Sequence, residues 1–175
     1  VEVNGKPFLW YVVDNLRQAG FDELGIVVGY RGEQVKQFCE ENGILATFIE
    51  QSEQLGTGHA LLQAKEFVGD ENFVVLGGDN LWAVDDLKEM NKDDNLNYIS
   101  VFKVDPPYDK YGVVVEENGL LQKIVEKPSK FVGDSINTGL FKLTPEIFST
   151  LSEVTESSRG EIELTDGLAD LLNDS

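Results

Sequence analysis

The residues best suited to chemistry lie at Gly77-Gly78-Asp79-Asn80, directly after the apolar run Phe73–Leu76. Four consecutive apolar residues predict a strand buried on both faces, which is typical of parallel sheets covered by helices. Ligands of open α/β sheets bind beyond the carboxyl ends of the strands, so Asp79 would lie where a metal ion or a substrate binds. The alternative is that these residues only form a tight turn, in which glycine, aspartate and asparagine are common. The residues alone leave both interpretations open.

Predicted helices and strands alternate in the segments that would position Asp79. The first helix has Pro7 in its first turn, an apolar face from Phe8 to Leu16, and a stop at Ala19-Gly20. The remaining elements of this half are the helices Gln34–Asn42 and Ala60–Val68 and the strands Leu24–Tyr30, Ala46–Gln51 and Phe73–Leu76. Such alternation indicates βαβ units, a parallel sheet and right-handed crossovers.

The pattern changes after Asn97, where strands dominate. Asn118-Gly119 is a strong hairpin turn signal between two of these strands. The predicted strands are Tyr98–Val104, Gly112–Val115, Leu120–Val125 and Ser135–Leu143, with helices after Thr144-Pro145 and after Gly160. We therefore predict an α/β fold, a Rossmann-like three-layer sandwich with a mostly parallel sheet and a small half with a mixed β-sheet. Residues 1–175 carry no repeat or linker, so we expect one domain.

Composition narrows the classes of partner. The chain of 175 residues has 41% hydrophobic residues, enough for a buried core, and a formal charge of −18 from 32 acidic and 14 basic residues. A field of this sign repels nucleic acid and anionic membranes, so we expect neither as a partner. The first residues lack a signal pattern, and Cys39 has no second cysteine to pair with, which favours a reduced, cytoplasmic setting. We interpret Cys39 as a packing residue rather than a nucleophile.

Five separated motifs occur in the order found in sugar-1-phosphate nucleotidyltransferases, which the chain resembles over essentially its whole length. They are Val3-Asn4-Gly5-Lys6-Pro7 before the first helix, the loop Gln51–His59, Gly78-Asp79-Asn80, Tyr111-Gly112 with Glu126-Lys127-Pro128 and Asn137-Thr138-Gly139, and Gly160-Glu161 with Leu164-Thr165-Asp166. Among these enzymes the chain looks most like archaeal glucose-1-phosphate uridylyl- and thymidylyltransferases.

The resemblance implies a reaction between two phosphorylated partners, a nucleoside triphosphate and a sugar 1-phosphate. A sugar phosphate oxygen attacks the α-phosphorus, and nucleotide sugar and pyrophosphate form with Mg²⁺. The protein then has to align two anions and neutralise the charge between them. In this family Asp79 would be a catalytic residue and the metal ligand, since a carboxylate suits a hard cation. Lys127 resembles the family lysine that meets the sugar phosphate, and we place it on the catalytic list.

The same resemblance assigns the binding residues. Gln51, Gly56 and Thr57 would contact the nucleotide, because a side-chain amide can donate to and accept from a pyrimidine while glycine lets the backbone lie close. The sugar-binding set would be Tyr111, Gly112, Glu126, Asn137 and Thr138. We interpret His59 as a structural residue, and Asp166 as a residue that caps the last helix.

Two parts of the family pattern are absent from the sequence. The family begins with a glycine-rich loop that contains an arginine and precedes a Pro-Lys pair, and this sequence opens just after that position. It also stops before the segment in which relatives supply a second metal-binding residue. We therefore expect the chain to be incomplete at both ends, and we expect little turnover from these 175 residues by themselves.

Two other functions fit parts of the pattern. A catalytically silent regulatory subunit of the same fold would bind a nucleotide sugar without making it, although such a subunit has no need for Asp79. A glycosyltransferase of similar topology would also carry an acidic metal site, but it would transfer sugar without forming pyrophosphate. The sequence leaves the base (uracil or thymine), the sugar, and a possible homo-oligomer undecided.

Overall fold

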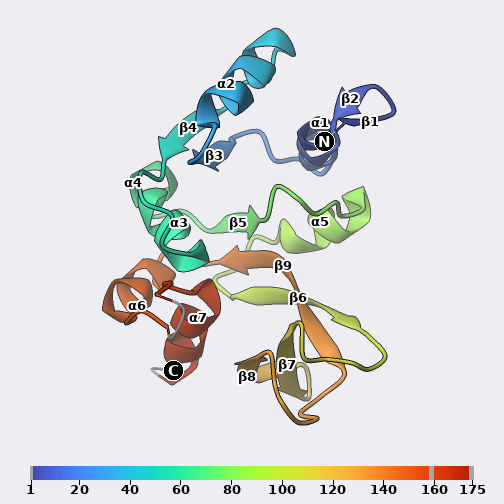
Figure 1. Ribbon diagram of the computed structural model, residues 1–175, viewed down its shortest axis with the longest axis vertical. Coiled ribbons are helices and arrows are strands. Elements are labelled where there is room, and N and C mark those ends of the chain that lie inside the picture. The colour runs from blue at the N-terminus through green and yellow to red at the C-terminus, as the bar shows by residue number, and fades with distance from the viewer. Residues whose placement is uncertain (1, 158–159, 174–175) are drawn as a thin grey trace.

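The computed structural model of the protein describes residues 2–157 and 160–173 (Figure 1). Its helices are α1 (Phe8–Gln18), α2 (Gly32–Glu41), α3 (Thr57–Gln63), α4 (Lys65–Val68), α5 (Val84–Met90), α6 (Ile147–Glu153) and α7 (Leu164–Asn173). Its strands are β1 (Glu2–Val3), β2 (Lys6–Pro7), β3 (Gly25–Val28), β4 (Thr47–Glu50), β5 (Phe73–Leu76), β6 (Tyr98–Lys103), β7 (Gly112–Glu117), β8 (Leu120–Glu126) and β9 (Ser135–Leu143). The α/β class predicted from the sequence is confirmed.

The strands of the described residues form three sheets. Strands β1 and β2 make a small antiparallel hairpin, and β3 pairs with β4 in parallel. The largest sheet has the order β5-β9-β7-β8, with β6 also beside β9, and all of its pairings are antiparallel. The sequence predicts a mostly parallel sheet. Among the described residues, the one parallel pairing is that of β3 with β4. Three of the four antiparallel pairings in the large sheet involve β9, which runs against β5, β6 and β7.

The core lies on both faces of β9. Phe141 and Leu143 point into a cluster with α3, α6 and α7, whereas Leu140 packs with Leu87 and Met90 of α5 on the opposite face. Strand β5 repeats this division, because Phe73 and Val75 contact the first cluster while Val74 and Leu76 contact the second. A central sheet thus lies between two helical layers, which is the predicted three-layer arrangement.

Two local predictions were wrong. The sequence predicts one helix from Ala60 to Val68, but the chain forms α3 and then α4, and α3 begins three residues earlier at Thr57. Helix α5 was not predicted, although Val84, Leu87 and Met90 have helical spacing and Leu87 and Met90 are buried. The acidic and amide residues around it concealed this spacing. Across residues 2–157 and 160–173, every helix falls short of the length and apolar character needed to cross a bilayer.

A buried lysine fixes the end of the large sheet. Lys142 of β9 is only 3% exposed, and its ammonium group donates to the Asp94 carboxylate and to the backbone carbonyls of Asp94 and Leu96. The Tyr98 hydroxyl also donates to Asp94, with 2.7 Å between the two oxygens. These hydrogen bonds, that of Lys142 first, lower the pKa of Asp94 from its ordinary value of 3.8 to about 2. The ion pair satisfies a charge that burial would otherwise make costly.

We predict that Asp94→Asn lowers the melting temperature at pH 7 by several degrees, because Lys142 loses its counter-charge. The folded-state pKa of Asp94 lies below 3.8, so its contribution to stability is fully present above about pH 4 and is lost as the pH falls toward 2. The melting temperatures of the original protein and of the Asp94→Asn variant should therefore approach each other as the pH falls over that interval. The matched control is Asp93→Asn, which removes the same charge from the exposed neighbouring residue. Equal melting temperatures for the two variants at pH 7 would contradict the prediction.

Candidate active site

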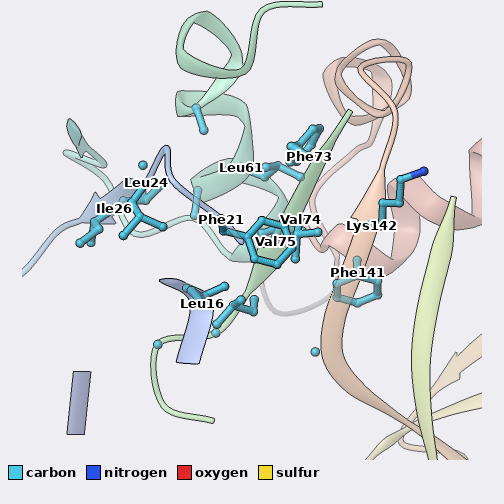
Figure 2. A pocket seen from close by; sticks show the side chains of 18 of the residues that line it. Leu16, Phe21, Leu24, Ile26, Leu61, Phe73, Val74, Val75, Phe141 and Lys142 are labelled. Carbon is cyan, nitrogen blue, oxygen red and sulfur yellow. The ribbon is translucent and has the colours of Figure 1, made fainter. Parts of the chain in front are cut away.

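A cleft of about 930 Å³ runs between the β3–β4 sheet and the large sheet. Five polar residues from separated segments line this cleft, Gln51, Thr57, Asp79, Glu126 and Asn137. The other lining residues are mostly apolar, and Figure 2 shows Ile26 on one side and Val74 and Val75 on the other. The part of the cleft lined by the five polar residues is the candidate active site.

Sheet pairing brings Asp79 to Asn137. Leu76, the last residue of β5, pairs with Leu140 of β9, so the turn that follows β5 lies beside the residues before Leu140. Asn80 then links the two segments, because its side-chain amide donates to the Thr138 carbonyl over 3.3 Å. The large sheet therefore places Asp79 next to a segment that lies about 60 residues later in the chain.

The Asp79 carboxylate is exposed and faces the cleft. It lies back over Gly77, where an added Cβ would stand 2.7 Å from Asp79 Oδ1. Any side chain at Gly77 would therefore displace the carboxylate. Among residues 2–157 and 160–173, no side-chain or backbone group donates a hydrogen bond to Asp79, which leaves both of its oxygens available to a ligand.

The loop that follows β4 is held from two directions. The Gln51 side-chain amide donates to the Gly56 carbonyl over 3.2 Å and lies 3.0 Å from Nδ1 of His59. On the far side, the Leu164 N–H donates to the Thr57 hydroxyl over 3.1 Å. With its amide nitrogen committed to the loop, Gln51 keeps its carbonyl oxygen as the acceptor for a ligand.

Gly56 is required by its conformation and by its surroundings. Its φ of +102° lies in the region that favours glycine, and an added Cβ would lie 2.6 Å from the Ile162 carbonyl oxygen. Two backbone hydrogen bonds also join this loop to Ile162: the Gly58 N–H donates to the Ile162 carbonyl, and the Ile162 N–H donates to the Leu55 carbonyl. The loop is therefore clamped to the segment that leads into α7.

The hairpin of β7 and β8 positions Glu126. Gly112 pairs with Glu126, and an added Cβ on Gly112 would lie 2.8 Å from Glu126 Oε1, so the carboxylate lies over the glycine. The next residue, Lys127, has a φ of +43° and donates its N–H to the Tyr111 carbonyl over 2.9 Å. A left-handed conformation costs a lysine about 1–2 kcal/mol. Residues held in this way cluster at functional sites.

Thr165 contacts a predicted site residue, although no role was predicted for it from the sequence. Its hydroxyl donates to Glu126 Oε1 over 3.2 Å, and the residue lines the cleft. Thr165 lies in the first turn of α7, one residue after the Leu164 N–H that holds Thr57. Adjacent residues of one helix therefore hold the loop that follows β4 and the predicted sugar-binding Glu126. Asp166, predicted as a cap, also lies in this first turn, where a carboxylate is favoured.

The predicted site residues fall into three groups. Gln51, Thr57, Asp79, Glu126 and Asn137 line the cleft together. Gly56 and Gly112 each contact one of these five, as described above. The third group lies outside the cleft lining and comprises Tyr111, Lys127 and Thr138. The Thr138 hydroxyl donates to the Ser100 carbonyl over 3.1 Å, which ties β9 to β6. The binding and catalytic roles of all ten residues stay predictions.

Comparisons with known proteins agree with the fold and the motif order. The family model described as nucleotidyl transferase matches residues 1–175. The low-salt glycan biosynthesis nucleotidyltransferase Agl11 of Haloferax volcanii is 32% identical over 99% of this chain, which spans 51% of that relative. From the same organism, the UTP–glucose-1-phosphate uridylyltransferase AglF is 35% identical over 98% of this chain and 73% of the relative.

A solved structure gives the same result for the fold. The UDP-glucose pyrophosphorylase complexed with UDP-glucose superposes with a TM-score of 0.84 and 21% identity, over 100% of this chain and 78% of the other. This likeness confirms the Rossmann-like α/β fold of the family. The full-length family match and the identity to AglF confirm the resemblance inferred from the five motifs. The chain belongs to the nucleotidyl transferase family.

Proposed function

We propose that the protein transfers a nucleotidyl group from UTP or dTTP to glucose 1-phosphate or a related sugar 1-phosphate. The observation that carries this proposal is that Gln51, Thr57, Asp79, Glu126 and Asn137, from separated segments of the chain, all line one cleft. The activity for which AglF is named, that of a UTP–glucose-1-phosphate uridylyltransferase, supports the same reaction. The chain spans only part of its relatives, so the proposal concerns the full-length protein.

The reaction is an in-line displacement at phosphorus. A phosphate oxygen of the sugar 1-phosphate attacks the α-phosphorus, the bond to the β-phosphate oxygen breaks, and pyrophosphate leaves. The protein supplies no nucleophile, so its contribution is alignment and charge stabilisation. Gln51 and the Gly56-Thr57 backbone would orient the base, while Glu126 and Asn137 would accept from and donate to sugar hydroxyls. Lys127 would meet the sugar phosphate as a cation beside the end of β8.

The Asp79 carboxylate is the type of oxygen ligand that suits Mg²⁺. The described part of the chain contains no group of three or more His, Cys, Asp or Glu side chains that could hold a metal ion by themselves. A cation at Asp79 would therefore take its other ligands from substrate phosphates and water, which is the usual coordination of Mg²⁺. When bound there, Mg²⁺ would neutralise charge on the phosphate oxygens. Asp79 would hold the ion with a carboxylate oxygen that accepts no hydrogen bond from the described residues.

A pyrophosphate-release panel tests the reaction on the full-length protein. UTP, dTTP, ATP and GTP are each combined with glucose 1-phosphate, N-acetylglucosamine 1-phosphate and mannose 1-phosphate in the presence of Mg²⁺. We expect pyrophosphate release with UTP or dTTP and glucose 1-phosphate or a related sugar. Binding of a nucleotide sugar without pyrophosphate release in any combination would instead identify a silent subunit, and sugar transfer to an acceptor would identify a glycosyltransferase.

Replacing the predicted metal ligand should abolish most activity without unfolding the protein. We predict that Asp79→Asn lowers kcat/KM by about 10²-fold to 10³-fold, the usual loss when one charge-stabilising group is removed. The melting temperature should not change, because Asp79 is exposed. Asp86→Asn is the matched control, since it neutralises an exposed aspartate in α5 without reaching the cleft. Activity within twofold of the original enzyme for Asp79→Asn would remove Asp79 from the mechanism.

Thr165 should act as a positioning residue for Glu126. We predict that Thr165→Val raises the KM for the sugar 1-phosphate about tenfold and leaves the KM for the triphosphate unchanged, because a hydrogen bond to a charged group is worth about 1.5–3 kcal/mol. Valine keeps the shape of the side chain and removes only the hydroxyl donor. Thr165→Ser should restore the original KM. Equal increases in both KM values, or no rescue by serine, would indicate a merely structural role.

A further inference from the structure

Two loops that carry predicted site residues lie side by side next to β7 and β8 (Figure 1). The first loop, residues 104–111, joins β6 to β7 and ends in Tyr111. The second loop, residues 127–134, joins β8 to β9 and begins with Lys127. Tyr111 and Lys127 therefore occupy the points where the two loops meet the β7–β8 hairpin. Contacts that hold the loops together also fix the backbone of both residues.

Backbone hydrogen bonds join the two loops at both ends of the second loop. At its start, the Lys127 N–H donates to the Tyr111 carbonyl over 2.9 Å. At its end, the Val104 N–H donates to the Asp134 carbonyl, also over 2.9 Å. Between these two points, the described residues form no further backbone hydrogen bond from one loop to the other. Side chains therefore have to hold the middle of the two loops together.

An aromatic pair makes this contact in the middle. The ring centroids of Tyr108 and Phe131 are 5.5 Å apart, and the ring planes are inclined at 56°. The distance lies within the range of favourable aromatic pairs. Phe131 is nevertheless 71% exposed, and Tyr108 is its one aromatic partner among the described residues. Because so little of the Phe131 side chain is buried, its contact with Tyr108 is the main interaction that it contributes.

The aromatic pair closes a path of contacts that passes through both predicted site residues. The Tyr111 N–H donates to the Tyr108 carbonyl over 3.1 Å, and the Tyr111 carbonyl accepts from the Lys127 N–H. From Lys127 the chain runs through the buried Pro128 to Phe131. The Phe131 ring then returns to Tyr108. Lys127 is therefore held from both sides, and loss of the ring contact would release one of them.

Lys127 is the residue on this path that depends most on its surroundings. Its φ of +43° lies in the left-handed region, which is unfavourable for a lysine. It also precedes Pro128, and a residue before a proline favours extended conformations. Such a conformation persists only where neighbouring contacts impose it. The exposed ion pair between Lys103 and Asp134, with 4.0 Å between nitrogen and oxygen, adds little to the contact between the loops.

We infer that Tyr108 and Phe131 are positioning residues for Lys127. Their contact holds the two loops at the separation that keeps the Lys127 backbone left-handed, and the backbone conformation sets the direction in which the lysine side chain leaves the end of β8. The inference rests on the proposed function for the task of Lys127, which would meet the phosphate of the sugar 1-phosphate. It adds two aromatic residues that lie outside the cleft lining.

Hydrogen exchange of the full-length protein tests the positioning without any substrate. In Phe131→Ala, the Lys127 amide should exchange about fivefold faster, because an exposed aromatic pair makes a modest contribution to local stability. Phe131→Tyr keeps a ring and should restore the original rate. The matched control is Phe102→Ala, since Phe102 is 63% exposed on β6 and belongs to no aromatic pair of the described residues. An unchanged rate in Phe131→Ala, or equal acceleration in Phe102→Ala, would overturn the inference.

Steady-state kinetics connect the positioning to the reaction. We expect Phe131→Ala to raise the KM for the sugar 1-phosphate about fivefold, to leave the KM for the triphosphate unchanged, and to be rescued by Phe131→Tyr. Faster exchange at Lys127 with an unchanged KM for the sugar 1-phosphate would overturn the assigned role. If no substrate pair reacts, the proposed function fails, whereas the exchange result still decides whether the aromatic pair positions Lys127.

Discussion

Strand β9 sets the geometry of the candidate site. It pairs with β5, β6 and β7, and the pairings with β5 and β7 position residues of the candidate site. The register with β5 places Asp79 beside Asn137, and the register with β7 leads through Gly112 to Glu126. A shift of one residue would turn every side chain of β9 to the opposite face. The core and the site therefore depend on the same set of backbone hydrogen bonds.

Charge is the second constraint on this site. A chain with a formal charge of −18 repels phosphorylated substrates, so binding them requires local cations. Lys142 and Lys92 both line the cleft, but the ammonium group of Lys142 is committed to Asp94, and that of Lys92 lies 3.8 Å from Glu89 Oε2. In the proposed reaction this task would fall to a metal ion at Asp79 and to Lys127, which lies outside the cleft lining. Such a task would explain why the strained Lys127 and the exposed, unbonded Asp79 are kept at some cost in stability.

The place of a residue in the structure could be predicted where it follows from the residue's position along the chain. The place of Asp79 in the cleft follows from the rule that ligands bind at the carboxyl ends of strands, whereas Gly56 was assigned from the resemblance to the family. Thr165 could not be found in this way, because its partner Glu126 lies 39 residues away on a different element. Helix α5 was missed because short apolar spacing among acidic residues resembles a loop. The half-burial of β5 was also beyond reach, since a run of apolar residues shows nothing about strand edges.

The position of Asp79 depends on strand β5. Asp79 follows β5 by three residues, so any freedom of the β5 edge is passed directly to the carboxylate. The opposite edge of β5 is fixed by β9, but an edge strand bonded on one side opens more readily than a central one. Catalysis by alignment needs reacting groups held to within a fraction of an ångström. The pairing of β5 with β9 is therefore part of the geometry of the site rather than only its support.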